Sequence, residues 1–108
     1  MGKQPLTESH LLDELGRPAG GMTSSTGLVI QWQNGPLGRG EEREEPNGAF
    51  VETVIRAAIG RLQFYNEGQF RCRENSLAIT HLEEALHWCN ARTARREDEQ
   101  VEGTHDGS

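Results

Sequence analysis

The sequence predicts a mainly helical α+β protein, in which one or more N-terminal strands precede a long antiparallel hairpin of two helices. Apolar residues recur every three or four positions from about residue 49, and an Asn-Glu-Gly sequence interrupts this pattern at 66–68. A short β-branched and aromatic run comes before it, at 28–33. Two helices of this size leave apolar surface uncovered, so we expect the protein to be oligomeric.

The first 25 residues are predicted to be a flexible N-terminal segment. They are rich in Gly, Ser, Thr and Pro. One amphipathic stretch, residues 9–15, is closed by Gly16, which is typical of a helix end. We therefore expect a short helix or disorder in this part of the chain, and a single domain over residues 26–96.

A β segment is predicted over residues 27–35. The run Leu28-Val-Ile-Gln-Trp-Gln33 is bounded by Gly27 and by the turn sequence Asn34-Gly35-Pro36. A lone strand leaves its backbone donors and acceptors unpaired, so it should pair with a neighbouring segment or with the same strand of another subunit. An acidic loop is expected to follow over residues 36–48.

Two helices are predicted over residues 49–66 and 73–96. The main apolar face of the first helix comprises Val51, Val54, Ile55, Ala58, Leu62 and Tyr65, and a second face carries Phe50, Ala57 and Phe64. The second helix is rich in Leu, Ala and Glu, which are strong helix formers. Because the connection is short, the helices should be antiparallel neighbours. The acidic composition of residues 97–108 predicts a flexible tail.

Charge is divided unevenly along the chain. The formal net charge is -6, but most of the acidity lies in the loop at 41–45 and in the tail. Between residues 46 and 96, seven arginines outnumber five glutamates. This balance permits a phosphate-bearing small molecule as ligand, whereas the lack of a large basic surface argues against nucleic-acid polymers. The sequence shows neither a long apolar run nor a secretory signal, so we expect a soluble cytoplasmic protein.

A heptad-like stripe on the second helix suggests where subunits meet. It comprises Asn75, Ala78, Leu82, Ala85, Cys89, Arg92 and Arg96. If two copies cross antiparallel near Ala85, Asn75 of one subunit comes close to Arg92 and Arg96 of the other. Within one chain these groups lie roughly 25 to 30 Å apart along the helix, at ~1.5 Å per residue. In the simpler interpretation, the arginines only complement the helix dipole and Asn75 belongs to an N-terminal cap.

Part of the sequence resembles a known family. The run Arg73-Glu-Asn-Ser-Leu-Ala-Ile-Thr-His-Leu-Glu-Glu-Ala-Leu-His-Trp88 resembles the signature of the helical-hairpin domain of phage proteins that inhibit the CBASS and Thoeris defence systems. Ile30-Gln-Trp-Gln-Asn-Gly-Pro36, Asn47-Gly48 and Arg61-Leu62 look like the anti-Thoeris branch, which carries an N-terminal β segment. The resemblance covers residues 28–105.

The resemblance implies a sponge: a protein that sequesters a cyclic nucleotide signal, such as glycocyclic ADP-ribose or a cyclic di- or trinucleotide, without cleaving it. It also implies a dimer or a hexamer that acts in the cytoplasm of the infected host. The ligand-binding residues it implies are Tyr65, Asn75, Arg92 and Arg96. Tyr65 stands where phenylalanine is expected in this branch.

The chemistry of these residue types suits such a ligand. An aromatic ring stacks on a base, and arginine binds phosphate oxygens in a bidentate way. Arg73, near the exposed N–H groups that begin the second helix, adds charge to a possible anion site, and Trp32 is a further aromatic candidate.

The sequence also bears on two other classes of function, an enzyme and a protein-interaction module. An enzyme would need a nucleophile or a metal, but His81, Glu84 and His87 spread over a broad helical arc, and no phosphate-binding loop is present. We therefore expect neither catalysis nor a cofactor or metal. An oligomeric phage protein-interaction module without a nucleotide ligand remains the alternative, because the apolar faces of the first helix could bind a protein partner.

Overall fold

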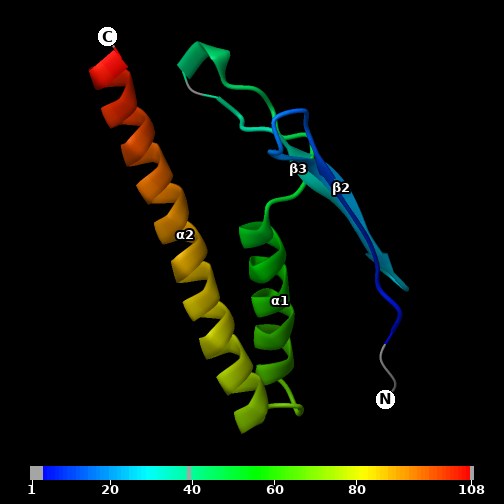
Figure 1. Ribbon diagram of the computed structural model, residues 1–108. Coiled ribbons are helices and arrows are strands. Elements are labelled where there is room, and N and C mark those ends of the chain that lie inside the picture. The colour runs from blue at the N-terminus through cyan, green and yellow to red at the C-terminus, as the bar shows by residue number, and fades with distance from the viewer. Residues whose placement is uncertain (1–3, 39, 108) are drawn as a thin grey trace. The chain divides into compact units, whose positions relative to one another are not determined.

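A computed structural model describes residues 4–38 and 40–107, and it confirms the predicted class: a small antiparallel sheet followed by two helices (Figure 1). The strands are β1 (Thr7–Leu12), β2 (Pro18–Ser25) and β3 (Leu28–Asn34). A 3-10 turn, η1 (Gly40–Glu42), precedes α1 (Val51–Asn66) and α2 (Arg73–Gly107). The chain forms two compact units, residues 1–50 and 51–108.

Residues 7–25 form two strands and the turn between them, so the expectation of a short helix or disorder over this part of the chain is wrong. β1 pairs with β2, and β2 pairs with β3, all antiparallel. The carboxylate of Asp13 accepts hydrogen bonds from the backbone N–H groups of Leu15 and Arg17, at 2.8 and 2.9 Å, and forms an ion pair with the Arg17 side chain. This local turn chemistry outweighs the helix-like spacing of the leucines, because it reverses the chain directly after β1.

Glycines allow the close backbone approach within the sheet. Gly21 has a φ of 136°, and a Cβ added there would lie only 2.0 Å from the carbonyl oxygen of Ser9 on β1. Gly27, with a φ of 77°, completes the two-residue loop between β2 and β3. An L residue with a side chain rarely adopts such backbone angles, so both positions favour glycine.

The predicted strand over 28–33 is confirmed as β3, and its partner comes from the same chain. On the side away from β2, the residues that end the acidic loop pair with it: Ala49 exchanges backbone hydrogen bonds with Gln31 and Gln33. The Asn47 side chain bonds both the N–H and the C=O of Asn34, at 2.7 and 2.9 Å. These bonds cover part of the outer edge of β3, which lowers its tendency to recruit another chain.

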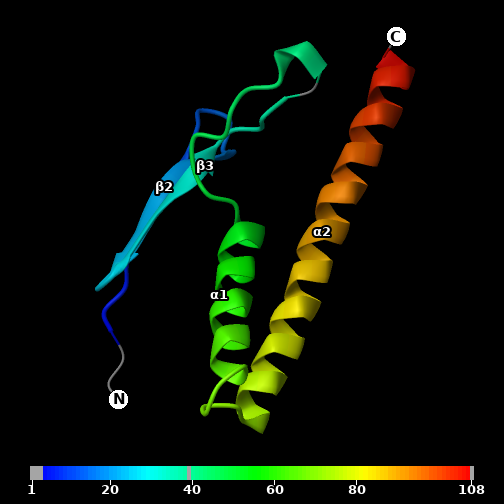
Figure 2. The same cartoon turned by 180° about the vertical axis from the view of Figure 1, so that it is seen from behind.

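The second unit is the predicted hairpin, with α1 and α2 antiparallel and side by side in both views (Figures 1 and 2). Asn66, the last residue of α1, closes the connection. Its side-chain Nδ2 donates to the Ser76 hydroxyl at 3.0 Å, and its side-chain Oδ1 accepts from the Cys72 backbone N–H at 3.3 Å. The loop is therefore tied to the first turn of α2, which fixes how the two helices begin to pack.

α2 is longer than the sequence predicts. It continues through Gly107, whereas the predicted helix ends at residue 96 and a flexible tail follows it. The sequence beyond Arg96 begins with Glu, Asp, Glu and Gln, which contains good helix formers and no proline or glycine before Gly103, so the backbone has no local reason to stop. The functional division of the chain into segment, domain and tail stays a prediction.

The core of the described part of the chain is very small. Ile59 of α1 is its one buried apolar side chain, while Phe64, Phe70 and Trp88 are 59%, 66% and 65% exposed. The chain by itself thus leaves a large apolar surface in contact with water.

In the described residues, no helix is both long enough and apolar enough to span a membrane.

Candidate functional site

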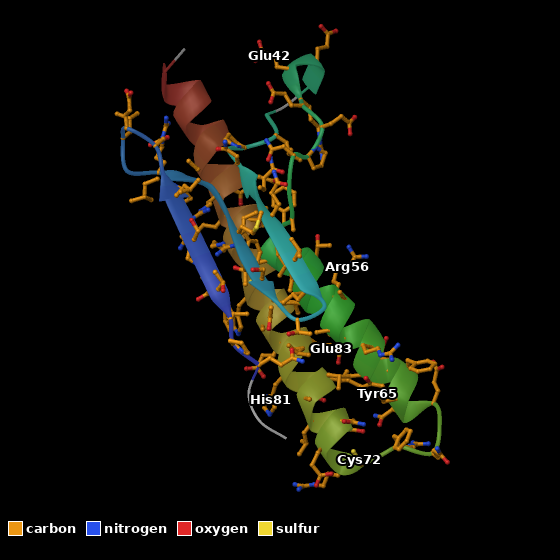
Figure 3. All side chains as sticks on the ribbon, turned by 90° about the vertical axis from the view of Figure 1, so that its right-hand side faces the viewer. Glu42, Arg56, Tyr65, Cys72, His81 and Glu83 are labelled. Atoms are coloured by element: carbon orange, nitrogen blue, oxygen red, sulfur yellow. The ribbon has the colours of Figure 1, made fainter. Side chains whose placement is uncertain are left out.

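The residues predicted to bind a ligand lie at two ends of the hairpin and on the sheet. Tyr65 lies in the last turn of α1, and Arg73 and Asn75 lie in the first turn of α2, so these three residues are near the connecting loop. Figure 3 shows Tyr65 and Cys72 at this end. Arg92 and Arg96 lie more than four turns further along α2. A single chain therefore does not bring the predicted residues together.

At the loop end, Tyr65 belongs to a cluster with Arg61 and Phe64. The Arg61 guanidinium carbon lies 5.0 Å from the centroid of the Phe64 ring and 5.1 Å from that of Tyr65. The Arg61 Nε–H also donates to the Tyr65 hydroxyl at 3.2 Å. Helical spacings of three and four residues place these side chains on one face of α1. The cluster combines a cation with two rings, which suits a planar, anionic ligand.

Asn75 and Arg73 occupy the first turn of α2. The Asn75 side chain is half-buried, and its Nδ2 donates to the backbone oxygen of Phe70 at 3.1 Å. The backbone N–H of Asn75 donates to the Cys72 sulfur at 3.4 Å, so Cys72 acts as the N-terminal cap. Arg73 is exposed. Cys72 thus fills the N-terminal capping role that the simpler interpretation of the sequence gave to Asn75. The Asn75 side chain instead donates to the loop that precedes α2.

Arg92 is held at the opposite end of the hairpin. Its Nη2 donates to the Glu52 carboxylate at 3.2 Å, and this ion pair links α2 to the first turn of α1. The Arg92 side chain is 45% exposed and that of Glu52 is 23% exposed. One contact uses one of the five donors of the guanidinium, so Arg92 keeps donors for a phosphate. Arg96 is exposed one turn further on.

The predicted stripe on α2 is partly covered within the chain. Its five residues from Asn75 to Cys89 are half-buried, and the two arginines are exposed. Leu77 and Trp88, on a neighbouring face of the same helix, are 41% and 65% exposed. A second copy that packs on α2 would therefore meet these two apolar side chains as well as the edge of the stripe.

Trp32 lies in the sheet unit, on β3. Its indole N–H donates to the hydroxyl of Thr23 at 2.8 Å, and Thr23 is the one buried polar residue among those described. The ring is half-buried and borders a shallow hollow of about 410 Å³ whose floor includes Gly20 and Gly21. Trp32 thus has a packing role in the sheet, and its predicted ligand contact stays a prediction.

A hollow in the hairpin is not lined by the predicted residues. It has a volume of about 780 Å³ and is open to solvent. It is lined by Gln63, Asn66, Glu67, Arg71, Ser76, Ile79 and Glu83. Two carboxylates face one guanidinium there, so the hollow by itself disfavours a phosphate. Among the described residues, no group of histidine, cysteine or acidic side chains has an arrangement that could hold a metal ion.

Two contacts of the predicted residues escaped the sequence analysis. The Arg61–Tyr65 contact follows an i, i+4 spacing that could have revealed it. The Glu52–Arg92 pair joins residues 40 positions apart and depends on the packing register of the two helices. No local pattern in the sequence reports that register.

Comparisons with known proteins agree with the hairpin. The family model described as the Acb2/Tad1 hairpin domain matches residues 25–94. The chain is also 47% identical, over 78 residues, to a protein of Bacillus phage SBSphiJ7 named Thoeris anti-defense 1. The matching region covers 72% of this chain and 52% of that protein, so the chain spans about half the length of this curated relative.

Proposed function

Because the chain belongs to the family of the Acb2/Tad1 hairpin domain, we propose that it counters a bacterial defence system by binding a cyclic nucleotide signal. The protein sequesters the signal without cleaving it, and the host effector stays inactive. It acts in the cytoplasm of the infected bacterium. Candidate ligands are glycocyclic ADP-ribose and cyclic di- or trinucleotides. The family and the name of the phage relative support the direction of this proposal, and the residue chemistry supports the kind of ligand.

The observation that carries the proposal is the nearly absent core of the hairpin. With Ile59 as the one buried apolar side chain among those described, the two helices need a further surface to cover their exposed rings. A second copy of the hairpin supplies such a surface, so the working protein is a dimer or a hexamer.

Self-association also completes the ligand site. When α2 of a second copy crosses antiparallel, the loop end of one hairpin meets the arginine end of the other. Tyr65, Asn75 and Arg73 then come from one subunit, and Arg92 and Arg96 come from its neighbour. The ring stacks on the base, the asparagine amide bonds base or ribose edges, and the two arginines bind phosphate oxygens.

The proposed mechanism is binding rather than catalysis. The residues proposed for the shared site include no general base beside a nucleophile, and their arginines and amide only donate or accept hydrogen bonds. Affinity comes from the stack, worth ~1–3 kcal/mol per base, and from charge-assisted phosphate contacts. A sponge acts by releasing its ligand slowly. A site shared between two subunits would bury the ligand and so slow its release.

The experiment that tests the proposal is a thermal-shift panel followed by recovery of the ligand. Glycocyclic ADP-ribose, cyclic dinucleotides and cyclic trinucleotides are each added at about 100 times the expected Kd, which stabilises a binding protein by about 2.7 kcal/mol. We expect one class to raise Tm by about 5 °C or more. Mass spectrometry after denaturation should return the ligand intact. The absence of any shift, or a cleaved product, would contradict the proposal.

The second candidate function is a protein-interaction module of the phage. The exposed rings of Phe64, Phe70 and Trp88 favour it, because apolar surface of this kind binds protein partners as readily as further copies of the chain. The two candidates differ in the thermal-shift panel: an interaction module keeps its Tm with every cyclic nucleotide, whereas a sponge responds to at least one.

A further inference from the structure

The arginine that contacts Tyr65 is not among the residues proposed to bind the ligand. Arg61 lies one turn before Tyr65 on α1 and touches that residue in two ways: its guanidinium covers one face of the ring, at 5.1 Å from the centroid, and its Nε–H donates to the hydroxyl at 3.2 Å. Phe64 flanks the same guanidinium at 5.0 Å, and its ring lies 6.1 Å from that of Tyr65.

The two contacts constrain the Tyr65 ring in different directions. A hydrogen bond at the hydroxyl fixes the edge of the ring, and the cation above the ring fixes the plane. Without them, fewer contacts would limit the rotamers of this ring, which lies in the last turn of α1 and is 36% exposed. Because the Arg61 guanidinium lies over one face of the ring, a second planar group would have to stack on the opposite face.

We propose that Arg61 is a positioning residue for the ligand: it holds the Tyr65 ring in the orientation in which its other face accepts the base. This inference rests on the proposed function, because it presumes that Tyr65 stacks on a base. Its physical basis is preorganisation. A ring that is ordered before binding loses less conformational entropy when the ligand arrives, and each rotamer-rich side chain immobilised on binding otherwise weakens affinity.

A merely structural role for Arg61 is a poor explanation of these contacts. Arg61 is exposed, Phe64 is 59% exposed, and exposed pairs of this kind contribute little to the stability of a fold. The contacts also lie within one helix, so they do not join α1 to α2. Removal of Arg61 should leave the hairpin intact, and a change in ligand affinity can then be assigned to the ring.

The test compares Arg61→Gln, Arg61→Lys and Arg56→Gln in the full chain. Arg56 lies on the same helix and is exposed, so its replacement removes an equal charge without touching the ring (Figure 3). The protein contains one tyrosine, so ¹³C-labelled tyrosine gives a ring signal that belongs to Tyr65 alone. We expect Arg61→Gln to shift that signal in the free protein, and Arg56→Gln to leave it unchanged. An unchanged signal in Arg61→Gln would overturn the positioning role.

Affinity for glycocyclic ADP-ribose supplies the second readout. We expect Arg61→Gln to weaken binding by about 3- to 10-fold, through the cost of ordering one side chain, and Arg56→Gln to change it by less than about 2-fold. Lysine keeps the charge but lacks the planar fork, so Arg61→Lys should bind nearly as weakly as Arg61→Gln. Full affinity in Arg61→Lys would show that charge alone matters and would overturn the inference.

A double-mutant cycle with Tyr65→Phe isolates the hydroxyl contact. Tyr65→Phe keeps the ring for stacking but removes the acceptor of the Arg61 hydrogen bond. If Arg61 acts through that ring, the double variant should bind no more weakly than Arg61→Gln alone. Fully additive losses would contradict the inference. Failure of the unsubstituted protein to bind any cyclic nucleotide would overturn the proposed function itself. The ring signal of the free protein tests the Arg61–Tyr65 contact without any ligand, so the two failures can be told apart.

Discussion

The ion pair between Glu52 and Arg92 places a negative charge next to an arginine that is proposed to bind phosphate, and one substitution can remove that charge. Glu52→Gln keeps the size of the side chain and removes its charge. Because the pair is partly exposed, at 23% and 45% for its two side chains, its loss should lower the free energy of unfolding by less than about 1 kcal/mol. The hairpin therefore stays folded.

The effect on ligand binding should be of opposite sign. A phosphate held by Arg92 would lie roughly 6 Å from the Glu52 carboxylate, since one guanidinium contacts both groups. At that distance the repulsion is about 0.7 kcal/mol in water, and more in a less polar site, so its removal should tighten binding by about 3-fold or more. Raising the ionic strength should reduce the gain.

Isothermal titration calorimetry with glycocyclic ADP-ribose measures this effect at two salt concentrations. Glu84→Gln is the matched control, because it removes an equal charge from an exposed position about two turns earlier on α2 and should change the Kd little. Weaker binding in Glu52→Gln would refute the reasoning. In that case the carboxylate would serve to hold Arg92 in place rather than to compete with the phosphate.

Three further changes test the fold and the assembly. Gly21→Ala should lower the free energy of unfolding by about 2–4 kcal/mol, because its Cβ would overlap a backbone oxygen of β1. Gly27 also has a positive φ but has open space around it, so Gly27→Ala should lower the free energy of unfolding by only about 1–2 kcal/mol. Equal losses in urea denaturation would contradict this difference. Trp88→Ser should weaken self-association by about 30-fold or more in analytical ultracentrifugation while helicity in circular dichroism stays the same, and an unchanged oligomer would place Trp88 outside the interface. The hydrogen bond from the backbone N–H of Arg17 holds the pKa of Asp13 below its ordinary value of 3.8. The stability that the Asp13 carboxylate contributes is therefore present above that value and is lost as the pH falls further. Asp13→Asn should lose less stability than the unsubstituted protein below about pH 4, and an identical acid transition would refute the assignment.

The hairpin could be predicted from the sequence because helical periodicity is a local signal. Residues from Val51 onward repeat on one helical face, and a short connection leaves the two helices few ways to pack. The strand over 28–33 was equally clear, since β-branched residues and Trp32 stand between glycine turns.

β1 and β2 could not be predicted in the same way. All side chains of β1 are exposed, and β2 is mostly half-buried but contains few apolar residues, so no alternation of apolar and polar residues marks either strand. The leucines at 11, 12 and 15 imitate the spacing of a helix, and β2 contains two adjacent glycines, which normally argue against a strand. The signal that was available is the turn: Asp13 followed by Gly16, whose φ is 79°.

The candidate site divides in a similar way. Separation of Asn75 from Arg92 follows from helix geometry alone, and the structure keeps these residues at opposite ends of the hairpin. The partners of the predicted residues required three-dimensional information: Glu52 for Arg92, and Cys72 as the cap that frees the Asn75 side chain from that role. The assignment of the ligand residues themselves stays a prediction.

Complementation between two defective variants tests most directly whether the pocket is built from two subunits. One variant carries Asn75→Ala and the other carries Arg92→Ala together with Arg96→Ala; each alone should bind no glycocyclic ADP-ribose. After subunits are exchanged, a twofold dimer should recover about a quarter of the binding sites, because each mixed dimer contains one pocket with both halves intact. A mixture that binds no more ligand than either variant alone would contradict the account.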